Sequence, residues 1–377
     1  MPETSTARPH AKPESGITVT FLALRGVQAG REYFVALCPL KLVPRLFAFH
    51  DPELPPELRA QRALNTARVP EIARYLVENP SSFVLSALSA SVDGDVIFEE
   101  LHTGGGSAFG QLSMPMESRL LINDGQHRRA AIEAALEERP ELGNETVPVI
   151  LFLDAGLTRS QQMFADLNRY AVKPTRSLGI LYDRRDPLAR LACDIATTVE
   201  PFRDHTEMEK TSLSNRARMV FTLSALYQGV TALLGNPKGT EVSADEAATA
   251  TRYWTTVGEL IRTWGFVKPG FTSAELRGAY VHTHAVALHA LGIAGAALIA
   301  RRPAGWEASM KKLASIDWTR SNPLWEGRAV RNGQITKAGP SVTLTANVIK
   351  TRLGLGLTEE EARHEKRLGQ EVARAAA

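Results

Sequence analysis

The sequence contains only two cysteines, Cys38 and Cys193, among 377 residues. Two distant cysteines provide neither a disulfide framework nor a pair of zinc ligands, which is typical of a protein of the reducing cytoplasm. Long apolar runs are also missing. The most apolar stretch, 285–300, contains His289 and two glycines and is too short to span a bilayer. It predicts a buried helix, and we expect no membrane association.

An excess of one charge sign is missing as well. Lysine and arginine number 44 and aspartate and glutamate 41, which leaves a net charge of +3. Any contact with nucleic acid must therefore come from locally clustered rather than overall charge. Residues 1–15 are polar and rich in proline and lack the apolar core of a secretory signal, so they predict a disordered leader.

The patterns that are present indicate a mixed α/β (α+β) protein with a helical second half. With 44% apolar and 23% charged residues, the chain is globular and long enough for two or three domains. Strand and helix patterns alternate at first, and from Leu188 to about Ala300 the strand signal disappears. The predicted parts are a leader at 1–15, an α/β domain at 16–185, a helical domain at 186–300, and a basic C-terminal segment with a terminal helix at 301–377.

One turn carries unusually dense polar chemistry. Residues 119–131 read R-L-L-I-N-D-G-Q-H-R-R-A-A, an apolar run that breaks at Asp124 before a helix. Glycine lets an anion approach the backbone, the first helical turn offers unpaired N–H groups, and an arginine adds a bidentate fork. This predicts a phosphate site at Gly125, Gln126, His127 and Arg128. A tight turn with solvated polar residues explains the stretch about equally well.

A second polar stretch follows the next predicted strand and shifts that balance. Residues 164–178 read F-A-D-L-N-R-Y-A-V-K-P-T-R-S-L and contain Asp166, Asn168 and Arg169. G-Q-H-R resembles the phosphate-binding turn of the ParB/sulfiredoxin fold, and N-R-x-x-x-x-P at 168–174 resembles a second box of ParB. Two boxes in the right order, joined by one strand, are far more specific than either alone.

More narrowly, D-G-Q-H-R is the signature of the DGQHR group, and the chain resembles its DndB branch, the regulatory member of the DNA phosphorothioate modification system. The resemblance continues through Y-V-H-T-H-A-V-A-L, I-D-W-T-R-S-N-P-L-W-E-G-R and L-T-A-N-V-I-K, and so covers nearly the whole chain after the leader. It implies a ParB/sulfiredoxin-like N-terminal domain and a protein that binds DNA at the promoter of the modification operon and represses it.

Two departures from the resembling families limit what they imply. Sulfiredoxin chemistry needs a thiolate in the turn, where this chain has Gln126, so we expect no sulfinic-acid repair. The glutamate of ParB's second box corresponds to Ala165, although Asp166 could supply a metal-binding carboxylate one position along. Nucleotide binding is therefore better supported than nucleotide turnover.

Basic residues cluster in three stretches, and phosphate contacts to DNA need such clusters. Alone, each stretch is more commonly a solvated surface; with the resemblance, they are the predicted DNA contacts. They are Lys173 and Arg176 beside the second box; Lys210, Arg216 and Arg218 in the helical domain; and Arg320, Arg328, Arg331 and Lys337 near the C-terminus. Trp325 in the third stretch is available to stack on a base.

Two functions follow from these residues. The first is a cytoplasmic repressor that binds double-stranded promoter DNA, as a homodimer if its operator is palindromic. The second is a nucleotide-dependent ATPase or DNA-nicking enzyme, with a nucleotide triphosphate and Mg²⁺ as cofactors. Its catalytic residues would be Asp124, His127 and Asp166, with Asn168 and Arg169 joining the turn to bind the nucleotide. The two functions can coexist, with nucleotide controlling DNA affinity.

Other reactive side chains are predicted to be structural. Cys38 ends a strand and is expected to be a buried small hydrophobe. His282 and His284 point roughly 200° apart on a helix, so they cannot share a metal ion and are expected to pack. The remaining tryptophans are expected to anchor the core; they are Trp254, Trp264, Trp306 and Trp318.

Overall fold

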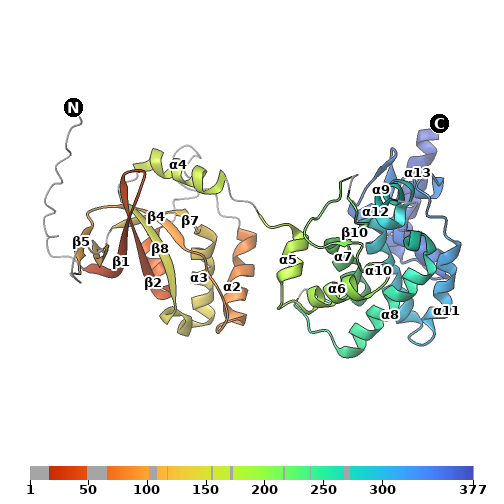
Figure 1. Cartoon of the computed structure of the whole chain (residues 1–377), viewed down its shortest axis with the longest axis horizontal. Coiled ribbons are helices and arrows are strands. Elements are labelled where there is room, and N and C mark those ends of the chain that lie inside the picture. The colour runs from red at the N-terminus through yellow and green to blue at the C-terminus, as the bar shows by residue number, and fades with distance from the viewer. Residues whose placement is uncertain are drawn as a thin grey trace. The chain divides into compact units, whose positions relative to one another are not determined.

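The computed structural model describes residues 17–48, 66–101, 108–116, 118–153, 156–169, 173–214, 217–237, 239–266 and 272–376. The chain divides into two compact units, Met1–Val172 and Lys173–Ala377 (Figure 1). The predicted leader at 1–15 lies outside the described residues.

Unit 1 is built on an eight-stranded sheet of order β3-β7-β4-β8-β2-β1-β6-β5 within the described ranges. Neighbouring strands are antiparallel except for the pairs β3–β7 and β4–β8. The strands are β1 (Thr18–Gln28), β2 (Arg31–Pro39), β3 (Phe47–Ala48), β4 (Leu88–Asp93), β5 (Ile97–Glu100), β6 (Phe109–Pro115), β7 (Arg119–Asp124) and β8 (Thr146–Leu153). This sheet with its helices confirms the mixed α/β prediction.

Two helices cover one face of the sheet, α2 (Val69–Glu78) and α3 (Gln126–Glu138), which lie side by side (Figure 1). Alternate strand residues point toward them because successive side chains of a strand face opposite ways. Leu88 and Ile122 are fully buried there together with Leu76 of α2 and Ile132 of α3. Pro70 lies in the first turn of α2, where its missing N–H costs no helical hydrogen bond.

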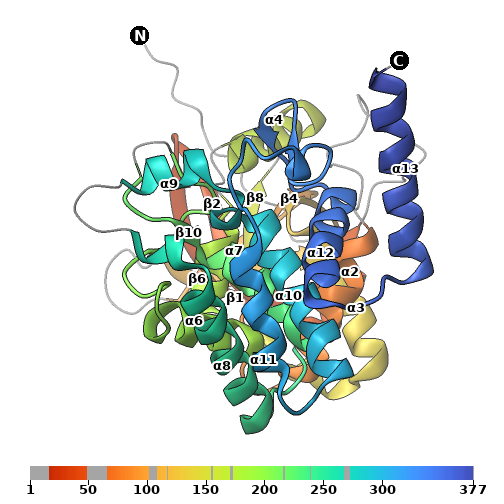
Figure 2. The ribbon, with the colours of Figure 1, turned by 90° about the vertical axis from the view of Figure 1, so that its right-hand side faces the viewer.

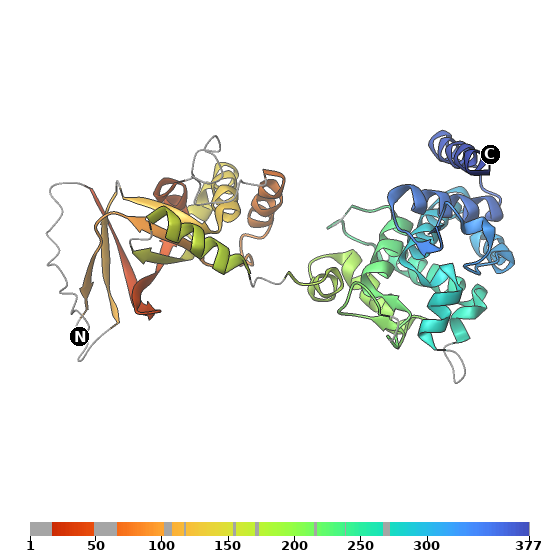
Figure 3. The ribbon, with the colours of Figure 1, turned by 90° about the horizontal axis from the view of Figure 1, so that it is seen from above.

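The opposite face of β4 and β7 is polar and is crossed by α4 (Gly156–Arg169) (Figure 3). Ser160 of α4 is hydrogen-bonded to Ser91 of β4 at 3.1 Å, and Asn123 of β7 donates to the same serine at 2.8 Å. All three side chains are buried. This contact fixes α4 beside the strand that leads into the D-G-Q-H-R turn.

Unit 2 is mainly helical, with short strand pairs added. Its helices are α5 (Arg176–Tyr182), α6 (Pro187–Thr198), α7 (Leu223–Leu234), α8 (Ala244–Leu260), α9 (Ser273–Ala279), α10 (Ala285–Arg301), α11 (Trp306–Met310), α12 (Gly339–Leu353) and α13 (Glu359–Ala376). Its two-residue strands are β9 (Thr206–Glu207), β10 (Phe221–Thr222), β11 (Val330–Arg331) and β12 (Gln334–Ile335). The helix predicted over 285–300 is confirmed as α10, which lies between α7 and α12 (Figure 2).

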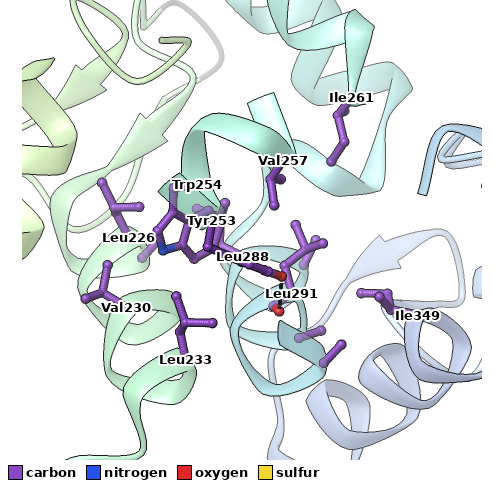
Figure 4. Close-up of a cluster of buried hydrophobic side chains, with 14 of the residues drawn as sticks. Leu226, Val230, Leu233, Tyr253, Trp254, Val257, Ile261, Leu288, Leu291 and Ile349 are labelled. Atoms are coloured by element: carbon purple, nitrogen blue, oxygen red, sulfur yellow. Dashed lines mark hydrogen bonds between the residues drawn. The ribbon is translucent and has the colours of Figure 1, made fainter. Parts of the chain in front are cut away.

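The core of unit 2 forms where α7, α8, α10 and α12 meet (Figure 4). Trp254 of α8 is fully buried there against apolar side chains of its neighbours. The backbones of α7 and α10 approach so closely that a Cβ at Gly292 would lie 2.2 Å from the carbonyl oxygen of Gly229, and glycine permits this approach. The predicted core role is confirmed for Trp254, Trp264, Trp306 and Trp318.

This division differs from the predicted domain limits at both ends of the helical domain. Ile180 of α5 belongs to the core of unit 2, so α5 lies with the helices although it precedes residue 185. Trp306 and Ile349 belong to the same core, so residues 301–377 are not packed separately from the helices before them. No helix in the described ranges is long and apolar enough to cross a bilayer.

Candidate functional site: the turn at 124–128 and a basic face of unit 2

The turn requires glycine at its centre. Gly125 precedes α3 with φ 111° and ψ 13°, a conformation that side chains rarely adopt. A Cβ at this position would lie 2.5 Å from Leu88 Cδ2 and 3.0 Å from Arg128 Nη2. The first helical hydrogen bond, from the Arg129 amide to the Gly125 carbonyl, begins α3 at once. Gly125 therefore permits the abrupt change from β7 to α3.

Arg128 is held by several partners around the turn. Its Nη2 donates to the Asp124 carboxylate at 2.6 Å and to the Ala87 carbonyl at 3.0 Å, and its Nη1 donates to the Ser86 hydroxyl. Its Nε is buried and has no hydrogen-bond partner among the described atoms. The guanidinium thus links Ser86 and Ala87, which directly precede β4, to the start of α3. Its positive charge is already paired with the carboxylate of Asp124.

The other residues of the turn divide between core and surface. Gln126 is buried, with 5% of its surface exposed, whereas His127 is half-buried. Arg129 is buried and was not among the predicted site residues. It donates to the carbonyls of Phe47 and Pro44 and pairs with Glu133 one helical turn later. The i,i+4 spacing of Arg129 and Glu133 is the sequence signal that could have identified this anchor.

Asp166, Asn168 and Arg169 of the second polar stretch lie on α4, in the same unit as the turn, whereas Lys173 and Pro174 belong to unit 2. Asp166 is exposed and accepts a hydrogen bond from Gln162 of its own helix at 2.8 Å. Arg169 is exposed at the end of α4, and the side chain of Asn168 lies outside the described atoms. The contact from Ser160 through Ser91 to Asn123 brings α4 to β7, one residue before Asp124.

The first two basic stretches meet around the N-terminus of α5 in unit 2. Thr175 and Ser177 donate hydrogen bonds to the carbonyls of Glu209 and Lys210, so the loop 207–214 lies against Arg176. Lys173, Arg176 and Lys210 are exposed, and Arg216 lies outside the described residues. Arg176 also lies close enough to α10 to contribute, after burial, to the lowered pKa of His289.

The far end of the same loop is braced by α9. Arg277 donates to the carbonyls of Leu213 and Ser214, both at 2.9 Å, and Ser273 donates to the carbonyl of Arg218. Arg218 is exposed. Arg277 was not among the predicted DNA contacts, because a single cation in a helical stretch gives no cluster in the sequence.

Arg320 of the third stretch joins the same region. Its amide donates at 2.7 Å to the carbonyl of Ala279, the last residue of α9. Burial chiefly lowers the pKa of His284 to about 4, and the charges of Arg277 and Arg320 also lower it. A hollow of about 730 Å³ adjoins Arg320. We define the basic face as Arg176, Lys210, Arg218, Arg277 and Arg320.

Acidic residues in this region are engaged by backbone amides. Glu207 accepts from the amides of Glu209 and Lys210, Glu275 caps α9 through Thr272, and Asp317 accepts from Thr319. These carboxylates are held by amides and hydroxyls of the chain itself rather than by side chains of the basic face. The same hydrogen bonds lower the pKa of Glu275 and Asp317, so both stay ionised and offset part of the positive charge of the face.

Two other residues of the third stretch, Trp325 and Arg328, have partners within unit 2. Trp325 is fully buried, stacks on Trp318 with ring centroids 5.0 Å apart, and donates to the Asp317 carbonyl. The prediction that it stacks on a base is wrong, because packing in unit 2 covers its ring. Arg328 is mostly buried and ion-paired with Glu365 of α13 at 2.7 Å. Arg331 and Lys337 are exposed.

The reactive side chains expected to be structural are placed as predicted. Cys38 is fully buried, and burial raises the pKa of its thiol to about 12. His282 is fully buried, lies within hydrogen-bonding distance of the Thr263 hydroxyl, and accepts from Trp264 Nε1 at 2.8 Å. Among the described residues, no group of three or more His, Cys, Asp or Glu side chains could hold a metal ion.

Comparison with known proteins agrees with the resemblance seen in the sequence. The model of the DndB family, described as DNA-sulfur modification-associated, matches residues 21–356. This match covers both units. No curated protein and no solved structure matches the chain.

Proposed function

The chain belongs to the DndB family of DNA-sulfur modification-associated proteins, and from this premise we propose that it is a cytoplasmic DNA-binding repressor of a DNA phosphorothioate modification operon. The observation that carries the proposal is the basic face of unit 2. Lysine and arginine neutralise DNA phosphates and release the bound counterions, which supplies affinity without reading bases. Arg176, Lys210, Arg218 and Arg320 come from separate parts of the chain and suit that task, whereas Arg277 holds the loop through the carbonyls of Leu213 and Ser214.

We assign the promoter contacts chiefly to the basic face rather than to the whole third stretch. Arg176, Lys210 and Arg218 are exposed, and Arg320 is half-buried with one N–H bonded to the Gly333 carbonyl. Arg328, in contrast, is committed to Glu365. An arginine that is already paired inside the protein loses that partner when it binds phosphate, so it contributes less affinity.

For unit 1 we propose a ParB/sulfiredoxin-like fold whose turn binds a phosphate group. The proposal is supported by β7, the left-handed Gly125 and the start of α3, which follow one another directly. An incoming phosphate would compete with Asp124 for Arg128, because that carboxylate already occupies Nη2. Asp124→Asn should therefore tighten binding of a nucleotide triphosphate, and Arg128→Gln should weaken it.

The second candidate function is a nucleotide-dependent ATPase or DNA-nicking enzyme, favoured by the adjacency of Asp124, His127 and Arg128. Asp124 is the carboxylate that pairs with Arg128, and no metal-binding group of three side chains occurs in the described ranges. These donors do not form a Mg²⁺ site by themselves, so the ion would have to arrive with the nucleotide. Hydrolysis and plasmid nicking in Mg²⁺, compared with His127→Ala and Asp166→Ala, test this candidate.

The test of the repressor proposal is the salt dependence of promoter binding. A triple variant, Arg176→Ala, Lys210→Ala and Arg320→Ala, should lower the slope of log K against log salt by up to about 2.7, at about 0.9 per lost phosphate contact. A charge-matched control removes three exposed cations of α13, Lys366, Arg367 and Arg374. Equal loss in both variants would show that only overall charge matters, and an unchanged slope in the first would remove the basic face from the DNA contact.

A further inference from the structure

Unit 1 exposes an apolar sheet face that its own helices leave uncovered. Leu22, Leu24, Leu37 and Phe109 have between 38% and 60% of their surface exposed. They come from β1, β2 and β6, strands that lie beyond the part of the sheet crossed by α4. The opposite face of the same strands is covered, since Ala23, Ala36 and Leu112 are buried in the core.

The strand register makes these residues one continuous surface. Ile150 of β8 pairs with Val35, Val35 with Leu24, and Leu24 with Phe109. Two residues further along these strands, Pro148 of β8 pairs with Leu37 of β2, and Leu22 lies on β1, the next strand of the sheet. Two residues in the opposite direction along the same face, Tyr33 of β2 pairs with Phe152 of β8, and their rings stack with centroids 5.9 Å apart. Aliphatic and aromatic side chains therefore fill most of three adjacent rows, which we call the apolar face; Gln111 of β6, which pairs with Leu22, is the polar residue at the β6 end of one row.

Charge is confined to the margin of this surface. The charged residues nearest to it on the same side are Glu99 on the edge strand β5, which pairs with Gln111, and Arg31 at the start of β2. A partner recognised by charge would find no ion pair to make within the three rows. A surface of mainly apolar character is instead complementary to another copy of itself, which a two-fold axis can bring face to face.

The area of the apolar face indicates how strongly two copies of the chain should associate through it. Four strands about 4.8 Å apart and three rows about 6.7 Å apart cover about 400 Å² of sheet on each copy. Two copies would bury about 800 Å² of flat area, below the 1,200–2,000 Å² of a standard stable interface. Such an area suits a weak, concentration-dependent dimer, and packing of one sheet on another is an established way to bury it.

We propose that the apolar face is a homodimer interface in which the sheets of two copies pack face to face. Dimerisation would double the number of basic faces on one particle, so that DNA carrying two half-sites would bind both with a high effective concentration. The interface itself does not depend on the proposed repressor function, because it is argued from unit 1 and can be measured without DNA.

The test is sedimentation velocity of the full chain without DNA over about 5–500 µM, a range suited to weak interfaces. The dimer fraction should rise with concentration. Leu24→Lys with Leu37→Lys should weaken dimerisation at least about tenfold, because each buries a charge at the centre of the interface. Both positions are more than half exposed, so the fold should tolerate the change.

A matched control places the same charges elsewhere. Val84→Lys with Tyr182→Lys alters two residues that are 80% and 68% exposed and lie off the apolar face, and it should leave dimerisation unchanged. A protein that stays monomeric throughout the range overturns the proposal, as does a dimer that survives Leu24→Lys with Leu37→Lys. Promoter binding measured on the same variants tests the repressor function separately.

Discussion

Replacing Gly125 by alanine should destabilise unit 1 without disturbing unit 2. Alanine in the left-handed conformation costs about 1–2 kcal/mol. The new Cβ would also lie 2.5 Å from Leu88 Cδ2, and Leu88 is fully buried, so its side chain has little room to move. Overpacking of this kind adds about 1–3 kcal/mol. We therefore expect the free energy of unfolding of unit 1 to fall by about 2–5 kcal/mol.

The distribution of tryptophan allows the two units to be followed separately. All five tryptophans of the chain lie in unit 2. In a urea titration, hydrogen exchange of peptides from β7 and α3 should shift to lower urea in Gly125→Ala, whereas the tryptophan fluorescence transition should stay in place. The control is Gly179→Ala in the exposed part of α5, where a Cβ meets nothing within 4 Å. There alanine should stabilise unit 2 by up to about 1 kcal/mol.

Two outcomes would refute this reasoning. If Gly125→Ala leaves the exchange of β7 and α3 unchanged, the left-handed conformation of the turn is not required for the fold. If it shifts the exchange and fluorescence transitions equally, the two units unfold together, and the boundary after Val172 does not separate cooperative units. A loss confined to unit 1 supports both the turn geometry and the division of the chain.

Two further predictions concern buried titratable groups. Burial lowers the pKa of His282 from 6.5 to about 3, so the unfolded state binds its proton first and the stability of unit 2 should fall as pH drops below 6.5. Between pH 6.5 and 5 His282 should account for about 1.6 kcal/mol of the loss, and His284, whose pKa is lowered to about 4, adds to it. His282→Asn should therefore lose less stability when unfolding is followed by tryptophan fluorescence, and an identical pH dependence would contradict this. Burial also keeps the Cys38 thiol protonated, so a thiol-specific reagent at pH 8 should modify Cys38 only after unfolding. Rapid labelling of Cys38, as distinct from Cys193, in the native protein would contradict its buried position.

Several features of the fold could be predicted because they depend on short-range interactions. The capping box of α8 joins Ser243 and Glu246, which are only three residues apart in the sequence. The uniformly apolar composition of α10 predicted a buried helix, since a helix apolar on all sides is stable only inside a protein. The Asp124-Gly125 step predicted the start of α3, because glycine readily adopts the conformation that this turn needs.

The sequence pattern was less informative where long-range packing decides a residue's role. Trp325 lies among basic residues, yet its ring is covered by Trp318. The partners of Arg128 at Ser86 and Ala87 lie about forty residues earlier in the chain, whereas Asp124 lies one helical turn away and could be foreseen. Arg277 acquires basic neighbours only through the fold.

The sequence by itself determined the turn at Gly125, the alternation of strands and helices, the helical second half and the family to which the chain belongs. Each of these depends on conformational preferences or motifs that span a few consecutive residues. Only the tertiary structure decided that α5 packs in unit 2, that Trp325 is buried, and that four segments carrying basic residues lie side by side. Burial and charge clustering arise from contacts between residues distant in the chain, and no local pattern records which of those contacts form.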